Sequence, residues 1–291
     1  MPSLRNIRKR IGAFRNTEKI TRAMKMVAAA KFRKAQEAVV RARPYARELR
    51  AMLERLAYHK DITDHPLMAR REVRHEDLFV LTSDRGLCGA FNANVLHRVE
   101  HYLLDNYDRR DQISLITIGR KAHAYFRKRG ARIRANLENL LDEPTFGRAR
   151  EVSEELARRF VAGEVDRITM VFSEFKSAVQ QPVVFRTLLP LDPPRAVRDE
   201  RADVDYLYEP EKGELLERII RRYLANQFFM ILMESVASEH GARMTAMDNA
   251  TENAGDLIQR MTLQYNKARQ SAITKELMEI VGGAEALRSG A

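Results

Sequence analysis

The stretch AAAKFRKAQEAVVRARPYARELRAMLERL, residues 28–56, decides the fold of this chain. Small or apolar residues recur in it at alternating intervals of four and three: Ala28, Phe32, Ala35, Val39, Ala42, Ala46, Leu49, Leu53 and Leu56. This spacing is the heptad seam of a helix that packs against another helix. Because the seam keeps its register beyond Pro44, we expect a kink there rather than the end of the helix.

The same rhythm extends towards the N-terminus. It continues upstream in Leu4, Ile7, Ile11 and Phe14, and the polar run RNTEK, residues 15–19, interrupts it. Pro2 lies where a proline costs a helix little. We therefore expect one helix over residues 1–60.

The C-terminal third mirrors this pattern. No proline follows Pro210, and a helical pattern runs from about Leu215 to about Ile280 within an expected helical domain of residues 211–285. Its seam comprises Met247, Thr251, Ala254, Ile258, Met261, Tyr265, Ala268 and Ala272. Helices of this size would be roughly 80–100 Å long at about 1.5 Å per residue, far beyond the width of a globular domain. The simplest arrangement is a long antiparallel coiled coil, thin because its seams are rich in alanine.

The middle of the chain has the pattern of an α/β domain. Short apolar runs predict buried strands at residues 77–82, 113–118, 168–175 and 182–191, and residues 148–162 read as an amphipathic helix. Alternating strands and helices predict a mostly parallel sheet covered by helices. The fold class is thus α/β, with a Rossmann-like domain over residues 75–195 between two coiled-coil helices. The proline-containing segment 191–210 reads as the linker back to the coil.

Charge is spread unevenly along the chain. Residues 1–60 hold 17 Lys and Arg against four acids, a net of +13 in a chain whose total is +11. Residues 205–291 hold 13 acids against ten Lys and Arg, which favours pairing of the two terminal helices. A basic helix also suits an acidic partner. A basic coiled-coil protein that binds nucleic acid is therefore one alternative. In proteins of that class, however, a basic block precedes a leucine-rich seam, whereas here the basic residues are spread along the whole helix and the seam is rich in alanine.

The segment TSDRGLCGAFN, residues 82–92, resembles a phosphate-binding loop and holds the only cysteine. It has neither the Lys of a P-loop nor the three glycines of a dinucleotide fingerprint. Cys88 as a nucleophile would need a base, and nothing in the sequence directs a histidine towards it, so we expect a packing role. His97 and His101 are one helical turn apart without a third ligand, which indicates a surface pair rather than zinc. We expect no catalytic, cofactor-binding or metal-binding residue, and an enzyme built on this loop is the second alternative.

Five long blocks of the sequence carry a family resemblance: KITRAMKMVAAAKFRKAQ (19–36), TSDRGLCGAFN (82–92), DYLYEP (205–210), EHGARMTAMDNATENAGDLI (239–258) and LQYNKARQSAITKELMEIVGGAEAL (263–287). These blocks resemble the gamma subunit family of the F-type ATP synthase. The resemblance runs nearly from end to end. It implies a non-catalytic rotor: proton flow turns a ring of c subunits, gamma turns with it, and the shaft drives the catalytic beta subunits in turn.

The resemblance also implies partners and contact residues. The partners are alternating alpha and beta subunits, three of each per gamma, together with epsilon and the c ring. The residues implied in coupling are Arg8, Met24, Lys25, Arg243, Arg269 and Gln270, with Tyr206 and Glu209 near the c ring and Cys88 close to the moving interface.

The single cysteine excludes the regulatory dithiol of plant relatives. No apolar run approaches the roughly 18 residues of a membrane span, and no transit or signal segment precedes the first block. We therefore expect a peripheral protein on the cytoplasmic face of a bacterial inner or plasma membrane.

Overall fold

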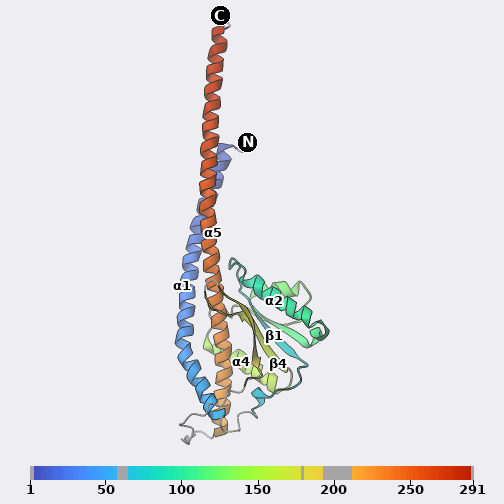
Figure 1. Ribbon diagram of the computed structural model, residues 1–291. Coiled ribbons are helices and arrows are strands. Elements are labelled where there is room, and N and C mark those ends of the chain that lie inside the picture. The colour runs from blue at the N-terminus through green and yellow to red at the C-terminus, as the bar shows by residue number, and fades with distance from the viewer. Residues whose placement is uncertain (1–2, 58–64, 178–179, 193–211, 290–291) are drawn as a thin grey trace. The chain divides into compact units, whose positions relative to one another are not determined.

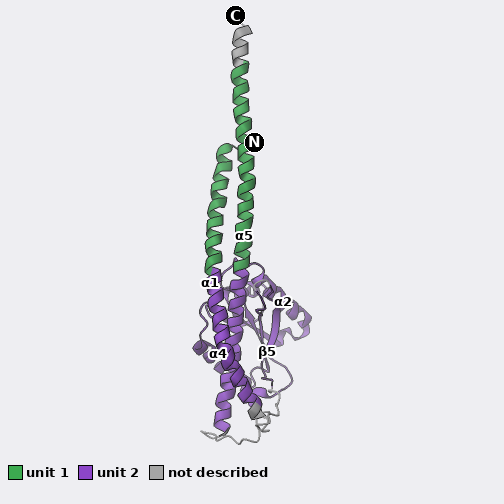
Figure 2. Ribbon diagram, turned by 60° about the vertical axis from the view of Figure 1, so that its left-hand side comes forward, with its two compact units in different colours: residues 1–27, 244–291 green, residues 28–243 purple. Residues whose placement is uncertain are grey.

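A computed structural model describes residues 3–57, 65–177, 180–192 and 212–289 of the chain (Figure 1). The chain divides into two compact units (Figure 2). Residues 1–27 and 244–291 form the first, which we call the two-helix unit, and residues 28–243 form the second, the α/β unit. The long helices α1 (Leu4–Ala57) and α5 (Lys212–Ser289) each contribute residues to both units.

Both terminal helices follow from the heptad patterns. α1 does not end at Pro44, as expected from the seam that continues past it. Within the two-helix unit, Thr21 meets Thr251 and Lys25 meets Asp248, so the residue numbers rise along one helix as they fall along the other. The antiparallel pairing that the sequence predicts is therefore confirmed in this unit.

A five-stranded sheet with strand order β3-β2-β1-β4-β5 forms the centre of the α/β unit. Its strands are β1 (Glu76–Leu81), β2 (Ile113–Ile118), β3 (Ile133–Leu137), β4 (Arg167–Ser173) and β5 (Val183–Leu189). β1, β2, β3 and β4 run parallel to one another, and β5 runs antiparallel to β4. Every residue of β1 and β2 is buried, and so is every residue of β4 after the first, as their continuous apolar runs predict.

Helices cover both faces of this sheet. The helices are α2 (Phe91–Asp105), α3 (Arg120–Arg127) and α4 (Phe146–Val161), with short 3-10 turns η2 (Pro66–Met68) and η3 (Tyr107–Gln112). One core joins the sheet to α2 and α3, and a larger core on the other face joins it to α4 and to the parts of α1 and α5 in this unit. The expected α/β fold class is thus confirmed.

β3 is the element that the sequence analysis missed. In its sequence IRANL, the polar residues Arg134 and Asn136 alternate with apolar ones. The strand lies at the edge of the sheet, and its side chains are partly exposed. A short edge strand with polar residues has no continuous apolar run to reveal it. The expected linker lies almost entirely outside the described residues, and the three domain ranges drawn from the sequence stay a prediction.

Candidate functional site

The segment TSDRGLCGAFN connects the end of β1 to the start of α2. Leu87 and Gly89 adopt positive φ angles of 63° and 56°, which turn the chain sharply between strand and helix. The turn is stabilised by Asn92, whose side-chain oxygen accepts a hydrogen bond from the Ser83 backbone N–H at 2.9 Å. The side chain of Leu87 is 63% exposed at the tip of this turn.

Cys88 lies inside the turn and is only 1% exposed. The Asn92 amide nitrogen donates to its Sγ at 3.2 Å, and the Ser83 hydroxyl lies 3.7 Å away. Among the residues that the structure describes, its hydrogen-bonding neighbours are Ser83, Asn92 and the Arg85 carbonyl, none of which is a base. This environment is that of a packed structural cysteine rather than of a nucleophile.

Arg243 connects α5 to the same turn. Its guanidinium donates to Glu239 at 2.8 Å and to the Gly86 carbonyl at 3.4 Å. The Arg243 and Glu239 side chains are only 12% and 11% exposed, so this is a buried ion pair. Burial raises the pKa of Glu239 above its usual value, and the charge of Arg243 opposes that rise. Burial, reinforced by the positive charges of Arg243 and Lys31, lowers the pKa of His240 to about 4.

The two-helix unit holds a second set of polar contacts. Lys25 Nζ lies 2.6 Å from Asp248 Oδ1, and the Thr251 hydroxyl donates to the Thr21 hydroxyl at 2.7 Å. Thr21 is 8% exposed, whereas the Lys25 and Asp248 side chains are 39% and 56% exposed. These contacts join α1 to α5 between residues more than 220 positions apart in the sequence.

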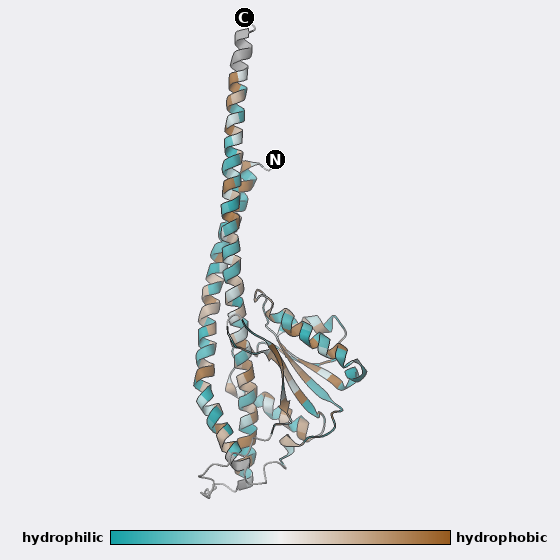
Figure 3. Cartoon of the chain, viewed as in Figure 1, coloured by the Kyte–Doolittle hydropathy of each residue, from teal (hydrophilic) through white to brown (hydrophobic). Residues whose placement is uncertain are grey.

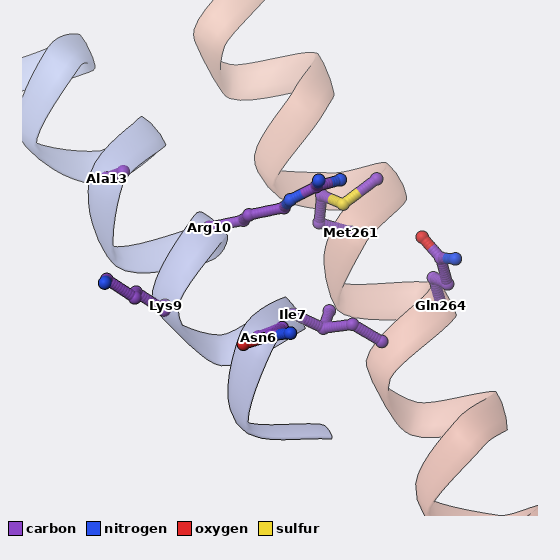
Figure 4. A pocket seen from close by; sticks show the side chains of 7 residues that line it. All are labelled: Asn6, Ile7, Lys9, Arg10, Ala13, Met261 and Gln264. Carbon is purple, nitrogen blue, oxygen red and sulfur yellow. The ribbon is translucent and has the colours of Figure 1, made fainter. Parts of the chain in front are cut away.

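A groove of about 320 Å³ opens between α1 and α5 nearer the start of the chain (Figure 4). Ile7 and Arg10 point from α1 towards α5, where Met261 lies, and Lys9 points away from α5. The groove offers few groups for chemistry, because its lining holds two cations, Lys9 and Arg10, and no carboxylate. The lining residues are Asn6, Ile7, Lys9, Arg10, Ala13, Met261 and Gln264.

The described residues contain neither a metal-ion site nor a membrane-spanning helix. In the parts of the chain that the structure describes, no group of three or more His, Cys, Asp or Glu could hold a metal ion. His97 and His101 are exposed on α2, as expected of a surface pair. Among the described helices, none is long and apolar enough to span a bilayer.

Known proteins resemble this chain over almost its whole length. A family model described as ATP synthase matches residues 3–287. The "ATP synthase gamma chain" of Anaeromyxobacter sp. (strain Fw109-5) is 48% identical over 99% of this chain and 100% of the relative. The chain belongs to the ATP synthase gamma chain family. The gamma chain of Trichlorobacter lovleyi is 43% identical, again over 99% of this chain and 100% of the relative.

Solved structures agree with the gamma chain assignment. A chain from the central stalk and c-ring structure of the Tetrahymena thermophila mitochondrial ATP synthase superposes with a TM-score of 0.62 at 26% identity. That match covers 79% of this gamma chain and 99% of the Tetrahymena chain. A chain from the Euglena gracilis mitochondrial ATP synthase gives a TM-score of 0.71 at 24% identity over 99% of this chain and 95% of its own, which supports the fold.

The structure of this gamma chain distributes the expected coupling residues between its two units. Arg8, Met24, Lys25, Arg269 and Gln270 belong to the two-helix unit. Arg8, Arg269 and Gln270 are exposed, whereas Met24 is half-buried. Lys25 is engaged by Asp248.

The remaining expected residues lie elsewhere. Cys88 and Arg243 belong to the α/β unit, where the turn carrying Gly86 brings them into one neighbourhood. Tyr206 and Glu209 lie outside the described residues. No contact among the described residues tests whether any of the nine meets a partner subunit.

Two carboxylates that hold these side chains in place were not predicted from the sequence. Glu239 stands four residues before Arg243 on the same helix, a spacing that is visible in the sequence, whereas Asp248 meets Lys25 only when α1 and α5 are paired. A signal existed for Thr21 and Lys25. The alternation of four and three that includes Ile7, Ile11 and Phe14 continues through residues 18, 21 and 25 to Ala28, so polar residues occupy these seam positions and the seam does not end there.

Proposed function

We propose that this gamma chain is the central rotor stalk of a proton-translocating F-type ATP synthase. Rotation of a c ring, driven by proton flow, turns the chain, and the chain in turn changes the conformation of the beta catalytic sites so that they make ATP. Hydrolysis runs the same cycle in reverse. The chain itself breaks and forms no covalent bond in this cycle, because the chemistry takes place on beta.

One observation supports this proposal more than any other. The far part of α5 in the two-helix unit leaves large apolar side chains on its surface, although no described helix is long and apolar enough to span a membrane. Leu263 is 71% exposed, Met278 67% and Ile280 68%. Exposed apolar surface of this extent marks a place where other proteins bind. If the shaft is enclosed by alpha and beta subunits, these subunits cover its apolar surface and no separate partner helix is needed.

The charge of the two helices suits the same partners. The cations of α1 lie mostly on its exposed side, and Arg22 and Arg41 reach only acids of their own helix. Exposed charges act across a Debye length of about 8 Å at physiological ionic strength. An attraction of this range lets acidic segments of beta approach the turning shaft without fixing it at one angle.

Individual residues then take the following roles. Met24 on α1 and Arg243 on α5 lie where the shaft meets the levers of beta, and Arg269 and Gln270 contact the loops of beta around the shaft. Arg8 and Lys25 on α1 also take part in coupling, and Cys88 lies in the turn 82–92, close to the moving interface. Tyr206 and Glu209 meet the c ring, and epsilon binds beside the α/β unit. The complex places the chain on the cytoplasmic face of a bacterial inner or plasma membrane.

Reconstitution with alpha and beta tests the proposal. Purified alpha and beta should give steady multisite ATP hydrolysis only when this chain is present, and the three proteins should elute together in size-exclusion chromatography. The variant Arg269→Ala/Gln270→Ala should assemble but turn over at least about tenfold more slowly, as expected when charged contacts of roughly 1.4 kcal/mol or more are lost. Lys275→Ala is the matched control, because Lys275 is exposed on the same helix and pairs only with Glu279 in the described structure.

Two results would overturn the proposal. One is full multisite turnover by alpha and beta without this chain. The other is a failure of the folded chain to associate with alpha and beta at micromolar concentrations.

A further inference from the structure

We infer that Lys25 and Asp248, together with Thr21 and Thr251, form a register lock that keeps α1 and α5 from sliding along each other while the shaft carries torque. The inference rests on the proposed function, because only a rotor shaft is loaded in this way. It assigns Lys25 a positioning role inside the chain, in place of a contact with beta.

The four residues form two neighbouring links across one helix pair. Thr21 and Lys25 are one turn apart on α1, and Asp248 and Thr251 are one turn apart on α5. The link Thr21–Thr251 joins two hydroxyls at 2.7 Å and lies in the seam, where Thr21 is 8% exposed. The link Lys25–Asp248 joins opposite charges at 2.6 Å at the border of the seam. Since both links run between the helices, an axial shift of either helix breaks both.

The hydrophobic part of the seam does not supply this specificity. Its buried members in the two-helix unit are Ile7, Ile11, Met247 and Ala254, and apolar side chains of this kind pack acceptably in more than one register. A polar residue at a seam position costs stability but favours one register, because any other register removes its partner on the facing helix. The single proton of the Thr251 hydroxyl is shared between the Thr21 hydroxyl and the Met247 carbonyl, each at 2.7 Å, so the hydroxyl link is the weaker of the two and the Lys25–Asp248 pair contributes most to the register.

The position of the lock also suits a shaft that carries torque. A shaft that transmits torque must not convert rotation into shear between its two helices. The residues of the α/β unit are held by a large apolar core, whereas the two-helix unit has only one narrow seam. Polar links are therefore needed most in the two-helix unit, and the described ion pairs that join α1 to α5 there consist of Lys25–Asp248.

A charge swap in the assembled membrane complex separates the lock from a contact with beta. Lys25→Asp and Asp248→Lys are made singly and together in a strain that lacks its own gamma chain. ATP-driven proton pumping is measured in inverted vesicles and divided by the ATP hydrolysed. Each single variant should lower this ratio about threefold, the size expected for an ion pair of this exposure, and the double variant should restore it to nearly the wild-type value.

Two controls define the specificity of the rescue. Lys25→Asp/Asp256→Lys has the same net charge as the swap, but Asp256 is exposed on α5 eight residues beyond Asp248, so it should not restore the ratio. Lys19→Asp makes the same charge change at an exposed residue of α1 for which the described structure gives no ion pair, and it should leave the ratio nearly unchanged. A merely structural defect would instead lower the amount of assembled complex, which is measured separately by immunoblot.

The swap can fail in a way that leaves the proposed function intact. If the wild-type chain supports coupled pumping and the double variant is no better than the worse single variant, Lys25 and Asp248 act independently and the lock is wrong. If the wild-type chain itself restores no pumping, the rotor assignment is wrong.

Discussion

The two compact units of this gamma chain are stabilised in different ways. The α/β unit buries large side chains completely on both faces of its sheet, among them Phe79, Phe126, Phe160, Phe172 and Phe228. In the two-helix unit the buried described residues are Ile7, Ile11, Thr21, Met247 and Ala254. In Figure 3, which is coloured by hydropathy, brown stretches gather on the strands of the α/β unit, whereas short teal and brown stretches alternate along the two-helix unit. The first unit has a core of its own, whereas the second depends on polar links and on surfaces that it presents to partners.

The contrast follows from what each unit does in a rotor. Burying apolar area stabilises a fold by roughly 25 cal/mol per Å², so a seam of small residues stabilises less than a sheet packed between helices. A thicker seam would stabilise the helix pair but widen the shaft. The thin seam thus trades stability for a narrow cross-section, and assembly with alpha and beta compensates for the loss.

Replacing Phe228 should have the largest effect on stability. Its ring is fully buried and meets Phe79 edge-on, with 6.1 Å between ring centroids. Phe228→Ala should lower the free energy of unfolding of the α/β unit by about 3–5 kcal/mol, measured by urea denaturation followed by circular dichroism. Leu263→Ala in the two-helix unit, where the side chain is 71% exposed, should change it by less than about 0.5 kcal/mol. Equal effects of the two variants would remove the distinction between the units.

Gly119→Ala should have the next largest effect. Gly119 precedes α3 with a φ of 92°, and an added Cβ would lie 2.0 Å from the carbonyl oxygen of Thr82. Both the strained backbone and the clash with main-chain atoms disfavour the variant, so we expect a loss of at least about 2 kcal/mol in the same urea experiment. If the free energy of unfolding fell by less than half of that value, the loops that follow β1 and β2 would move apart more easily than their packing suggests.

Acidic pH should destabilise the α/β unit through His240. The pKa of His240 is lowered from 6.5 to about 4 in the folded chain. Between these values the unfolded chain binds a proton that the folded chain resists, so stability is complete above pH 6.5 and falls as the pH drops towards 4. From pH 7 to pH 5 the loss should be about 1–2 kcal/mol, the lower figure allowing for solvent screening of this partly exposed ring.

The His240→Gln variant isolates this contribution. Glutamine does not titrate, so the variant should lose about 1–2 kcal/mol less than the wild type over the same pH interval. The raised pKa of Glu239 contributes a slope of the opposite sign, which is present in both proteins and cancels in their difference. Identical slopes in the two proteins would mean that His240 is not held in its neutral form.

Gly12→Ala should have the smallest effect, and it should be stabilising. Gly12 lies inside α1 in the two-helix unit, and an added Cβ would meet no atom within 4 Å. Removing the flexibility of glycine from a helix interior should stabilise α1 by about 0.5–1 kcal/mol. Slower amide hydrogen exchange over residues 4–20, measured by mass spectrometry, is the expected readout. Unchanged exchange would show that this part of α1 is limited by its seam rather than by its own helix propensity.

Heptad spacing and apolar runs were enough to predict most of the fold. The seam from Ala28 to Leu56 fixed the first helix even across Pro44, because seam periodicity reports on packing partners and not only on local propensity. β3 escaped because a half-exposed edge strand such as IRANL has no run of buried residues. The other edge strand, β5, is also partly exposed but was predicted, because its sequence VVFRTLL is an apolar run. An edge strand is therefore visible in the sequence only where its residues are apolar.

The candidate site was less predictable for a related reason. Cys88 could be assigned to packing because the sequence offered it no base, and the turn around it agrees. The Arg243–Glu239 pair is an i, i+4 contact within α5, which the spacing in the sequence allows but does not single out, whereas the Lys25–Asp248 pair depends on which turns of α1 and α5 face each other. The second of these pairs spans 223 residues, and no local pattern encodes such a contact without the register of the folded helices.

Direct observation of rotation tests the central claim. A bead attached to a single cysteine at Leu104→Cys, an exposed position on α2, in a Cys88→Ala background reports the angle of this chain inside an immobilised complex of alpha and beta. The account predicts rotation in one direction in the presence of ATP, in steps of a third of a turn that match the three beta subunits. ATP hydrolysis that depends on the chain while the bead stays at a fixed angle would contradict it.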